Sequence, residues 1–122
     1  MNHWRLLFIA VLVATLQGQS PPTETPYTIG PDVSAPRVIS KVDAGYTREA
    51  MEARREGDVL LELVVTGDGK ASDVHEISKP VGCGLDESAI KAVEQWRFRP
   101  GEKNGKPVLV MSQIAVRFRV PH

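Results

Sequence analysis

Few residues in this chain have the types and spacing that catalysis or metal binding would need. The candidate metal ligands are the three histidines and the single cysteine, His3, His75, His122 and Cys83. None of them stands at the short spacing that places two ligands on one metal ion. The sequence also shows no nucleophile next to a general base. It therefore predicts no catalytic residue, no metal site and no cofactor.

Two short motifs resemble reactive sites but have simpler interpretations. The stretch GDGK, residues 67–70, is rich in glycine, yet it lacks the pattern of a phosphate-binding loop and lies between two apolar runs. It therefore predicts a β-hairpin, in which Gly67 and Gly69 can supply positive φ. The adjacent acids Asp86 and Glu87 stand at the start of a helical pattern, where carboxylates stabilise the positive helix end.

The stretch EQWRFRPG alternates aromatic and basic side chains, as surfaces that bind single-stranded nucleic acid do. Against that, 15 basic and 15 acidic side chains cancel, so the chain has no overall field that attracts nucleic acid. We interpret Trp96 and Phe98 as core residues and expect Arg97 and Arg99 to remain outside. Pro100, followed by a glycine, prevents the helix from continuing. Nucleic acid is therefore not a predicted partner.

The chain divides into three predicted segments. Residues 1–20 hold the unbroken apolar run LLFIAVLVATL after Arg5, which is typical of a signal peptide. As a helix this run reaches about 17 Å, against the ~30 Å of a bilayer core, so a signal peptide or a weak signal anchor is favoured over a full membrane span. Residues 21–36 are rich in proline and predict a linker. The folded domain is predicted over residues 37–122.

Export bears on the role of the cysteine. Cys83 is the only cysteine in the chain, so an internal disulfide is impossible. The residue either pairs between chains or serves as a small residue in the tight loop GCG.

The folded part begins with a predicted helix and strand. The helix, TREAMEARREG, starts at the N-cap Thr47 and ends at Gly57. The run DVLLELVVT, residues 58–66, alternates in its apolar residues and predicts a strand. It pairs through the GDGK turn with ASDVHEIS, residues 71–78. On this returning strand Val74 and Ile77 fall on opposite faces unless a bulge intervenes.

A second helix and a long last strand follow. The helix, residues 85–96, has Asp86 as its predicted N-cap and one apolar stripe, Leu85, Ala89, Ile90, Val93 and Trp96. The strand, residues 108–120, is longer than the usual ~5 to 6 residues. One face carries Val108, Val110, Ser112, Ile114, Val116 and Phe118, and the other carries Leu109, Met111, Gln113, Ala115, Arg117 and Arg119. A strand longer than its neighbours leaves backbone unpaired, which is either an aggregation hazard or a docking edge.

The order helix, strand, strand, helix, strand predicts an α+β fold. We expect a three-stranded antiparallel sheet with two helices packed on one face. The long C-terminal strand is expected at the edge of this sheet.

The ordered motifs resemble a known family. The stretches YTREAMEARREGDVLLELVV, DGKASDV, GLDESAIKAVEQWRFRPG and NGKPV are similar, in order and spacing, to the C-terminal domain of TonB-type energy transducers. The resemblance covers about residues 38–118. Its specific positions are Tyr46, Gly57, Asp68, Gly69, Trp96, Arg97, Phe98 and Pro100.

This resemblance implies a role in the periplasm. Such domains grip a short N-terminal segment of an outer-membrane receptor by strand addition along the last strand, and they transmit force from a proton-driven motor in the inner membrane. Strand addition gives affinity with little demand on side chains. The implied docking edge is Val108, Leu109, Val110, Met111, Ser112, Gln113, Ile114, Ala115 and Val116. The candidate steering charges are Arg97, Arg99, Arg117 and Arg119, which are otherwise solubility charges on an exposed strand.

The chain departs from this family near its N-terminus. Family members carry a full membrane anchor with a histidine that faces the motor, followed by a long proline-rich linker. Here the apolar run is short and holds no histidine, the linker is residues 21–36, and Thr47 stands where the family usually has proline. The resemblance therefore predicts the grip on a partner, and no inner-membrane motor is predicted to act through this chain alone.

Two alternatives use the same edge. One is a stand-alone periplasmic module that binds other envelope proteins without energy transduction. The other is a homodimer that pairs or swaps its last strands. In each case a proline at Ser112 is expected to weaken pairing, because it removes a main-chain donor.

Overall fold

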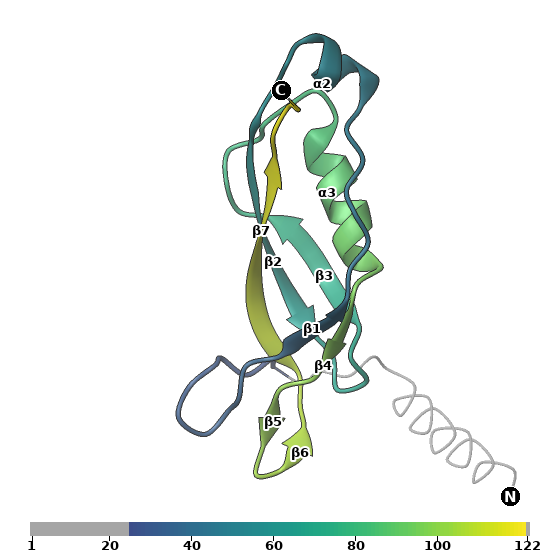
Figure 1. The fold of residues 1–122 in the computed structure, drawn as a ribbon. Helices are drawn as coiled ribbons and strands as arrows, with labels where there is room; N and C mark the ends of the chain where they lie inside the picture. Colours follow the sequence, from purple (N-terminus) through teal and green to yellow (C-terminus); the bar gives the residue numbers. More distant parts are fainter. Residues whose placement is uncertain (1–24, 122) are drawn as a thin grey trace, which may run out of the picture.

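A computed structural model describes residues 25–121 of the chain. Its centre is a three-stranded antiparallel sheet in the order β3, β2, β7, with helix α3 along one face and the short helix α2 toward one end on the same side (Figure 1). This arrangement confirms the predicted α+β fold and the edge position of the last strand. The elements are β1 (Arg37–Ser40), α2 (Arg48–Glu52), β2 (Gly57–Val65), β3 (Ala71–Glu76), α3 (Leu85–Glu94), β4 (Arg97–Arg99), β5 (Glu102–Lys103), β6 (Lys106–Pro107) and β7 (Val110–Phe118). The predicted signal peptide, residues 1–20, lies outside the described residues, as do residues 21–24 and His122.

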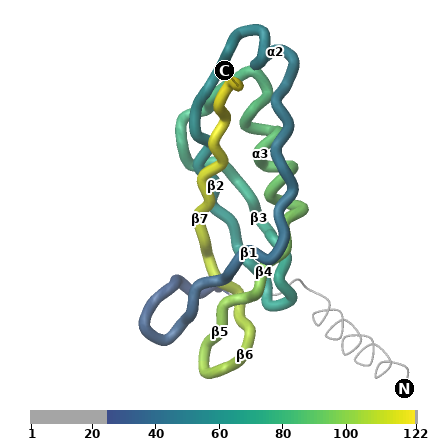
Figure 2. The backbone as a smooth tube through the Cα atoms, in the orientation of Figure 1, coloured from purple at the N-terminus to yellow at the C-terminus, as the bar shows by residue number. Residues whose placement is uncertain are grey.

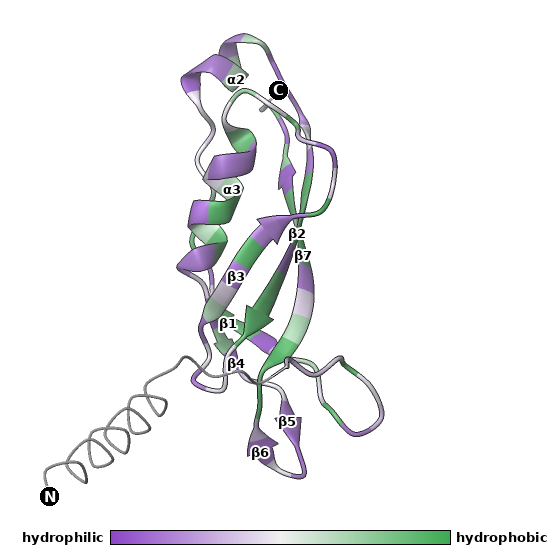
Figure 3. Ribbon diagram, turned by 180° about the vertical axis from the view of Figure 1, so that it is seen from behind, coloured by the Kyte–Doolittle hydropathy of each residue, from purple (hydrophilic) through white to green (hydrophobic). Residues whose placement is uncertain are grey.

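The core forms where the apolar side of β2 meets α3. The fully buried positions of β2 are Val59, Leu61, Leu63 and Val65, which confirms the predicted alternation. Helix α3 contributes Leu85, Ala89 and Val93, and Figure 3 shows its hydrophobic and hydrophilic residues on different sides. Burial of one Val or Leu side chain contributes about 1.5–3 kcal/mol, so each of these buried side chains helps to hold α3 on the sheet.

Helix α3 begins differently from the prediction. Its N-cap is Gly84, with a φ of 79° that glycine adopts without steric cost. The carboxylate of Asp86 instead accepts hydrogen bonds from the N–H groups of Val81 (2.8 Å) and Gly82 (3.0 Å). Burial acts to raise the pKa of Asp86, but these donors outweigh it and hold the pKa below its usual value. The prediction of Asp86 as N-cap is therefore wrong, because its side chain fixes the preceding loop.

Helix α2 starts as predicted and is shorter than predicted. Thr47 is the N-cap, and its hydroxyl accepts a hydrogen bond from the N–H of Ala50 at 3.0 Å. The helix has only five residues, and Arg54 then takes a left-handed φ of 50°. Gly57 opens β2, where a Cβ would lie 3.0 Å from the side chain of Val81. The prediction that Gly57 ends the helix is wrong, since the glycine allows close packing instead.

The GDGK turn joins β2 and β3 as predicted. Gly69 has a φ of 84°, whereas Gly67 is not in the left-handed region. The carbonyl of Gly69 accepts a hydrogen bond from the N–H of Phe98 at 2.8 Å. A Cβ on Gly69 would overlap the carbonyl oxygen of Phe98. Gly69 therefore lets the hairpin approach the segment that follows α3.

A bulge shapes strand β3. The register shifts between Ser72 and His75, where Asp73 takes a φ of 51°. Val74 packs against the core, while Ile77 is exposed beyond the end of the strand. Because of the bulge, Val74 faces the core while Ile77 stays exposed.

A second small sheet covers one end of the core. Strands β1 and β4 pair antiparallel, with Val38 opposite Phe98. Trp96 and Phe98 are 9% and 5% exposed, which confirms them as core residues. Arg97 and Arg99 are exposed on either side of Phe98. Pairing with β1 holds the segment after Trp96 extended.

Residues 25–36, predicted as a linker, lie against the domain. Val33 is 6% exposed and pairs with β5. The N–H of Ser34 donates to the carbonyl of Glu102 at 3.0 Å, and the N–H of Glu102 donates to the Ser34 hydroxyl at 2.9 Å. Figure 2 shows this loop at the same end of the molecule as β5 and β6. From there Tyr27 reaches the start of β7.

Candidate functional site

Strand β7 has one fully paired side and one largely open side. Its inner side pairs with β2 along its whole length, from Val110 opposite Val65 to Phe118 opposite Gly57. On its outer side, a single parallel bridge with Tyr27 is the only pairing within residues 25–121. Burial alternates along the strand as predicted.

The contact with Tyr27 shows which main-chain groups point outward. The N–H of Tyr27 donates to the carbonyl of Leu109 at 2.8 Å, and the N–H of Met111 donates to the carbonyl of Tyr27 at 2.9 Å. The direction of the main-chain groups alternates from residue to residue along a strand. The groups of Gln113 and Ala115 therefore also point outward, and no described residue pairs with them.

Ser112 points the other way. Its main chain faces β2, where it stands opposite Leu63. A proline at Ser112 would therefore break the ladder inside the sheet, because the main-chain donor that it removes faces β2. The substitution that removes an outward donor is a proline at Gln113 or Ala115. The Ser112 hydroxyl is buried and has no hydrogen-bond partner within the described part of the chain.

The edge strand is shorter than predicted. Strands β7 and β2 have nine residues each, so β7 has no overhang past its neighbour. The N–H of Val108 donates to the carbonyl of Gly101 at 3.0 Å, and the N–H of Val120 donates to the carboxylate of Glu56 at 2.8 Å. Both ends of the predicted strand are thus engaged elsewhere. Strand β7 starts at Val110, so Val108 and Leu109 of the predicted docking edge precede the strand.

Two hollows flank the outer edge of β7. The first, of about 340 Å³, is lined by Thr28, Ile29, Glu62, Met111, Ser112 and Gln113. The second, of about 420 Å³, lies between residues 41–44 and residues 115–117, with Trp96 in its wall. Side chains of an added strand would alternate between the two faces of the sheet. Such a strand would therefore have side chains within reach of both hollows.

The four arginines expected to steer a partner do not form one cluster. Arg97 and Arg99 lie on β4, near the end of the sheet where β7 begins (Figure 1). The guanidinium of Arg119 is 3.1 Å from the carboxylate of Asp58. Arg117 is exposed and lines the second hollow. Of the four, Arg117 is the one that lies on the edge strand β7 itself.

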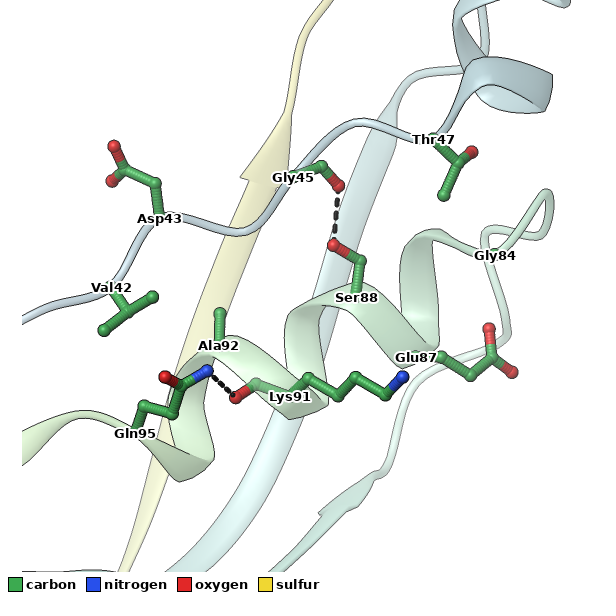
Figure 4. A pocket seen from close by; sticks show the side chains of 10 residues that line it. All are labelled: Val42, Asp43, Gly45, Thr47, Gly84, Glu87, Ser88, Lys91, Ala92 and Gln95. Carbon is green, nitrogen blue, oxygen red and sulfur yellow. Dashed lines mark hydrogen bonds between the residues drawn. The ribbon is translucent and has the colours of Figure 1, made fainter.

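A third hollow, of about 350 Å³, separates α3 from the segment that leads to α2 (Figure 4). Within it the Ser88 hydroxyl donates to the carbonyl of Gly45 at 2.6 Å, and the side-chain amide of Gln95 donates to the carbonyl of Lys91 at 3.2 Å. These polar groups are engaged by backbone. The hydrogen bond from Ser88 to Gly45 thus holds residues 42–47 against α3.

Of the residues first considered as metal ligands, Cys83 and His75 lie within residues 25–121, whereas His3 and His122 lie outside the described residues. Cys83 is half-buried with a φ of 56°, and its carbonyl accepts a hydrogen bond from the Thr47 hydroxyl at 2.5 Å. His75 lies 3.4 Å from the carboxylate of Glu62. Over residues 25–121 no three His, Cys, Asp or Glu side chains group as a metal ion would require.

The remaining motif residues support the frame around β7. The rings of Tyr46 and Phe118 meet edge to face, with centroids 5.6 Å apart. Asp68 accepts a hydrogen bond from the Thr66 hydroxyl, which holds the pKa of Asp68 below its usual value. Pro100 follows β4 directly, where the chain turns toward β5. These positions act through packing and turn geometry.

The outer walls of this site were not among the predicted residues. They are formed by residues 28–29 and 41–44. The available signal was the isolated pair of apolar residues Tyr27 and Ile29 in a segment otherwise rich in proline. That spacing places both side chains on one face of an extended chain.

Comparison with known proteins identifies the family. Residues 43–120 match the family described as Gram-negative bacterial TonB protein C-terminal. The chain belongs to the TonB C-terminal domain family. This finding confirms the resemblance drawn from the motifs. The matched residues of this TonB domain include both helices and all of β7, and the family is not a family of enzymes.

Two TonB proteins are similar to this chain. Protein TonB of Vibrio cholerae serotype O1 is 32% identical over 89 residues, which are 72% of this chain and 36% of that protein. Protein TonB of Escherichia coli K12 is 31% identical over 77 residues, which are 63% of this chain and 32% of that protein. The chain thus spans about a third of the length of these relatives.

A solved structure confirms the TonB fold. The solution NMR structure of the Pseudomonas aeruginosa TonB C-terminal domain superposes with a TM-score of 0.61 at 21% identity. The match covers 81% of this chain and 98% of that domain. Among residues 25–121, no helix is both long and apolar enough to cross a membrane.

Proposed function

We propose that this TonB domain binds an extended N-terminal segment of an outer-membrane receptor by adding it as a strand to the outer edge of β7. The observation that carries the proposal is the row of outward main-chain groups at Gln113 and Ala115, which have no partner within residues 25–121. The inner side of the same strand is fully paired with β2, so the edge is held in shape before a partner arrives. Main-chain hydrogen bonds then supply affinity, and the flanking hollows supply selectivity.

The charges around the edge support an acidic or polar partner segment. Arg117 lies on the edge and is the main steering charge in this proposal. Arg97 and Arg99 add positive charge near the start of β7, where steering raises the rate of encounter at low ionic strength. Arg119 contributes less, because Asp58 lies 3.1 Å from its guanidinium.

The proposed setting is the periplasm, reached through the export signal of residues 1–20. The TonB family supports a part in energy-dependent transport across the outer membrane. We assign the grip on the receptor to this chain and the proton-driven force to other proteins.

The same open edge favours a second candidate function. Met111 is 39% exposed on the edge, and an uncovered edge strand is a template for pairing with another chain. Two copies could pair through β7 around a twofold axis, or an envelope protein other than a receptor could add its strand. The solution mass of the chain distinguishes the dimer, since receptor docking requires no dimer.

A titration tests the first candidate. The chain is mixed with synthetic peptides from the N-terminal segments of outer-membrane receptors of the same organism, and amide resonances are followed by NMR. We expect a receptor peptide to shift Gln113, Ala115 and Arg117, while a peptide of the same composition in scrambled order leaves them in place. Absence of binding at high micromolar peptide, together with binding to a different envelope protein, would exclude receptor docking.

A further inference from the structure

The first pairing position of the docking edge is occupied by the chain itself. Tyr27 lies beside Val110 as a parallel bridge. The N–H of Tyr27 donates to the carbonyl of Leu109, just before β7, at 2.8 Å, and the carbonyl of Tyr27 accepts a hydrogen bond from the N–H of Met111 in β7 at 2.9 Å. The ammonium of Lys103 lies 4.7 Å from the centre of the Tyr27 ring, which is a cation–π contact. Tyr27 thus makes contacts that an added strand would make.

A firm anchor keeps this segment close to β7. Gly30 and Val33 close a turn through two hydrogen bonds, of 3.1 and 3.3 Å between N and O. Val33 is buried, and Ser34 bonds to β5. Gly101 makes room for this contact, because a Cβ there would overlap the carbonyl oxygen of Ser34. The anchor gives Tyr27 a high effective concentration at the edge.

The contact at Tyr27 is much looser than the anchor. Tyr27 is 40% exposed and Ile29 is 47% exposed, against 6% for Val33. Pairing with β7 stops after one bridge, and the next two residues line the first hollow instead of continuing along the edge. A contact with few buried apolar atoms opens locally at little cost. Tyr27 can therefore leave the edge while Val33 stays in place.

We propose that residues 25–29 are a tethered strand that competes with the partner for the edge of β7. For the docking edge, this inference rests on the proposed function. For the segment that covers the edge, it rests on the contacts of Tyr27. A partner that pairs from Leu109 onward must displace Tyr27, because both use the same main-chain groups. The partner cannot bind while Tyr27 covers the edge. Its apparent affinity is therefore its intrinsic affinity multiplied by the fraction of time that the edge is free.

The first test is amide hydrogen exchange in the full chain. Tyr27→Pro removes the N–H that bonds to Leu109. Thr28→Pro is the matched control, because the N–H of Thr28 donates no hydrogen bond within the described residues. The Met111 amide is expected to exchange about tenfold faster in Tyr27→Pro than in the unchanged chain or the control, as local opening requires. Equal exchange at Met111 in all three chains would overturn the proposal.

The second test uses the chain's own segment as the probe. A peptide of residues 23–32, TETPYTIGPD, is added to the unchanged chain and to Tyr27→Pro. Tyr27→Pro is expected to bind it about threefold to thirtyfold more tightly, the range that one or two net hydrogen bonds support, with shifts at Met111 and Gln113. Equal affinity for both chains would exclude competition at this edge.

Receptor peptides form a separate arm of the same titration. If they bind Tyr27→Pro more tightly than the unchanged chain, both the docking site and the competition are supported. If they bind neither chain, receptor docking fails, and the result with the peptide of residues 23–32 still decides whether the resident strand covers the edge.

Discussion

The indole Nε1 of Trp96 donates a hydrogen bond to the carbonyl oxygen of Val42, 2.9 Å away and 54 positions earlier in the chain. The Trp96 ring also packs against Phe98, with centroids 6.3 Å apart. The bond fixes residues 41–44, which form one wall of the second hollow beside β7. A core aromatic residue just after α3 thereby positions the residues that flank the second half of β7.

Trp96→Phe keeps an aromatic ring and removes the donor. We expect the free energy of unfolding to fall by about 1–3 kcal/mol, because the variant loses packing and leaves the Val42 carbonyl without its partner. Urea denaturation measures this change, and amide exchange at residues 41–44 is expected to accelerate. Lys41→Gln is the control, since its ammonium lies over the same ring at 5.4 Å but is exposed, and about 0.5 kcal/mol or less is expected. Unchanged exchange at residues 41–44 in Trp96→Phe would contradict this role.

The variants Gly69→Ala and Gly105→Ala distinguish the cost of backbone strain from the cost of the close approach of Phe98 to residue 69. Both glycines have left-handed φ, 84° and 77°. A Cβ on Gly69 would overlap the carbonyl of Phe98, whereas nothing lies within 4 Å of a Cβ on Gly105. Gly105→Ala is therefore expected to cost about 1–2 kcal/mol, and Gly69→Ala about 2 kcal/mol more. Equal midpoints of urea unfolding for the two variants would show that the approach of Phe98 has no energetic weight.

Asp86→Asn tests the loop contact before α3. The folded pKa of Asp86 is lowered, so its carboxylate stabilises the fold above the unfolded pKa, and this contribution is lost as pH falls through the folded value. At pH 7 we expect a loss of about 1–3 kcal/mol, because an amide cannot accept hydrogen bonds at both of its terminal atoms. The loss should shrink below about pH 4. Glu87→Gln, at an exposed site of the same turn, is the control and is expected to change stability by less than about 1 kcal/mol.

Glu76→Gln is predicted to change the stability at pH 7 in the opposite direction from Asp86→Asn. Burial, followed by the nearby Asp86 carboxylate, raises the pKa of Glu76. The folded chain therefore holds this proton more firmly than the unfolded chain, and stability falls as pH rises from the unfolded to the folded pKa. Glu76→Gln is expected to be more stable than the parent at pH 7, by less than about 1 kcal/mol, and to match it near pH 4. Urea unfolding at both pH values measures this, and a destabilised variant at pH 7 would refute the assignment.

The elements of the fold that could be predicted are those determined by residues close together in the sequence. The alternation of Val59, Leu61 and Leu63 marks a strand because side chains alternate along an extended chain. Thr47 marks a helix start because its hydroxyl reaches the N–H three residues later. These signals depend on local geometry alone, so the sheet, both helices and the edge position of the last strand were all predictable.

The errors lie where distant segments meet. Gly57 and Asp86 were misassigned because both contact Val81, in a loop whose path no local pattern reports. The start of β7 was misplaced because the N–H of Val108 bonds to Gly101. The direction of each main-chain group on the edge is set by the register with β2 and by the contact with Tyr27, both of which join distant segments. The edge was therefore predictable as a strand, and its outward groups were not.

Ala115→Pro tests the docking edge directly. The N–H of Ala115 points outward, whereas the N–H of Ile114 faces β2 opposite Leu61. Proline is tolerated on an edge strand where the lost N–H faces solvent, so Ala115→Pro should keep the fold. Its affinity for a receptor peptide is expected to fall at least about tenfold, since the peptide loses a main-chain bond and meets the proline ring. Ile114→Pro is expected to cost about 3 kcal/mol or more of stability.

Ala115→Ser is the matched control for this substitution. It retains the outward N–H and adds one hydroxyl to an exposed position, so its affinity for the peptide should match that of the parent. Calorimetric titration of the three chains, with urea unfolding alongside, compares binding and stability in the same samples. If Ala115→Pro binds the receptor peptide as tightly as Ala115→Ser, partners do not add a strand at this edge, because an added strand would lose the bond to the Ala115 N–H and meet the proline ring.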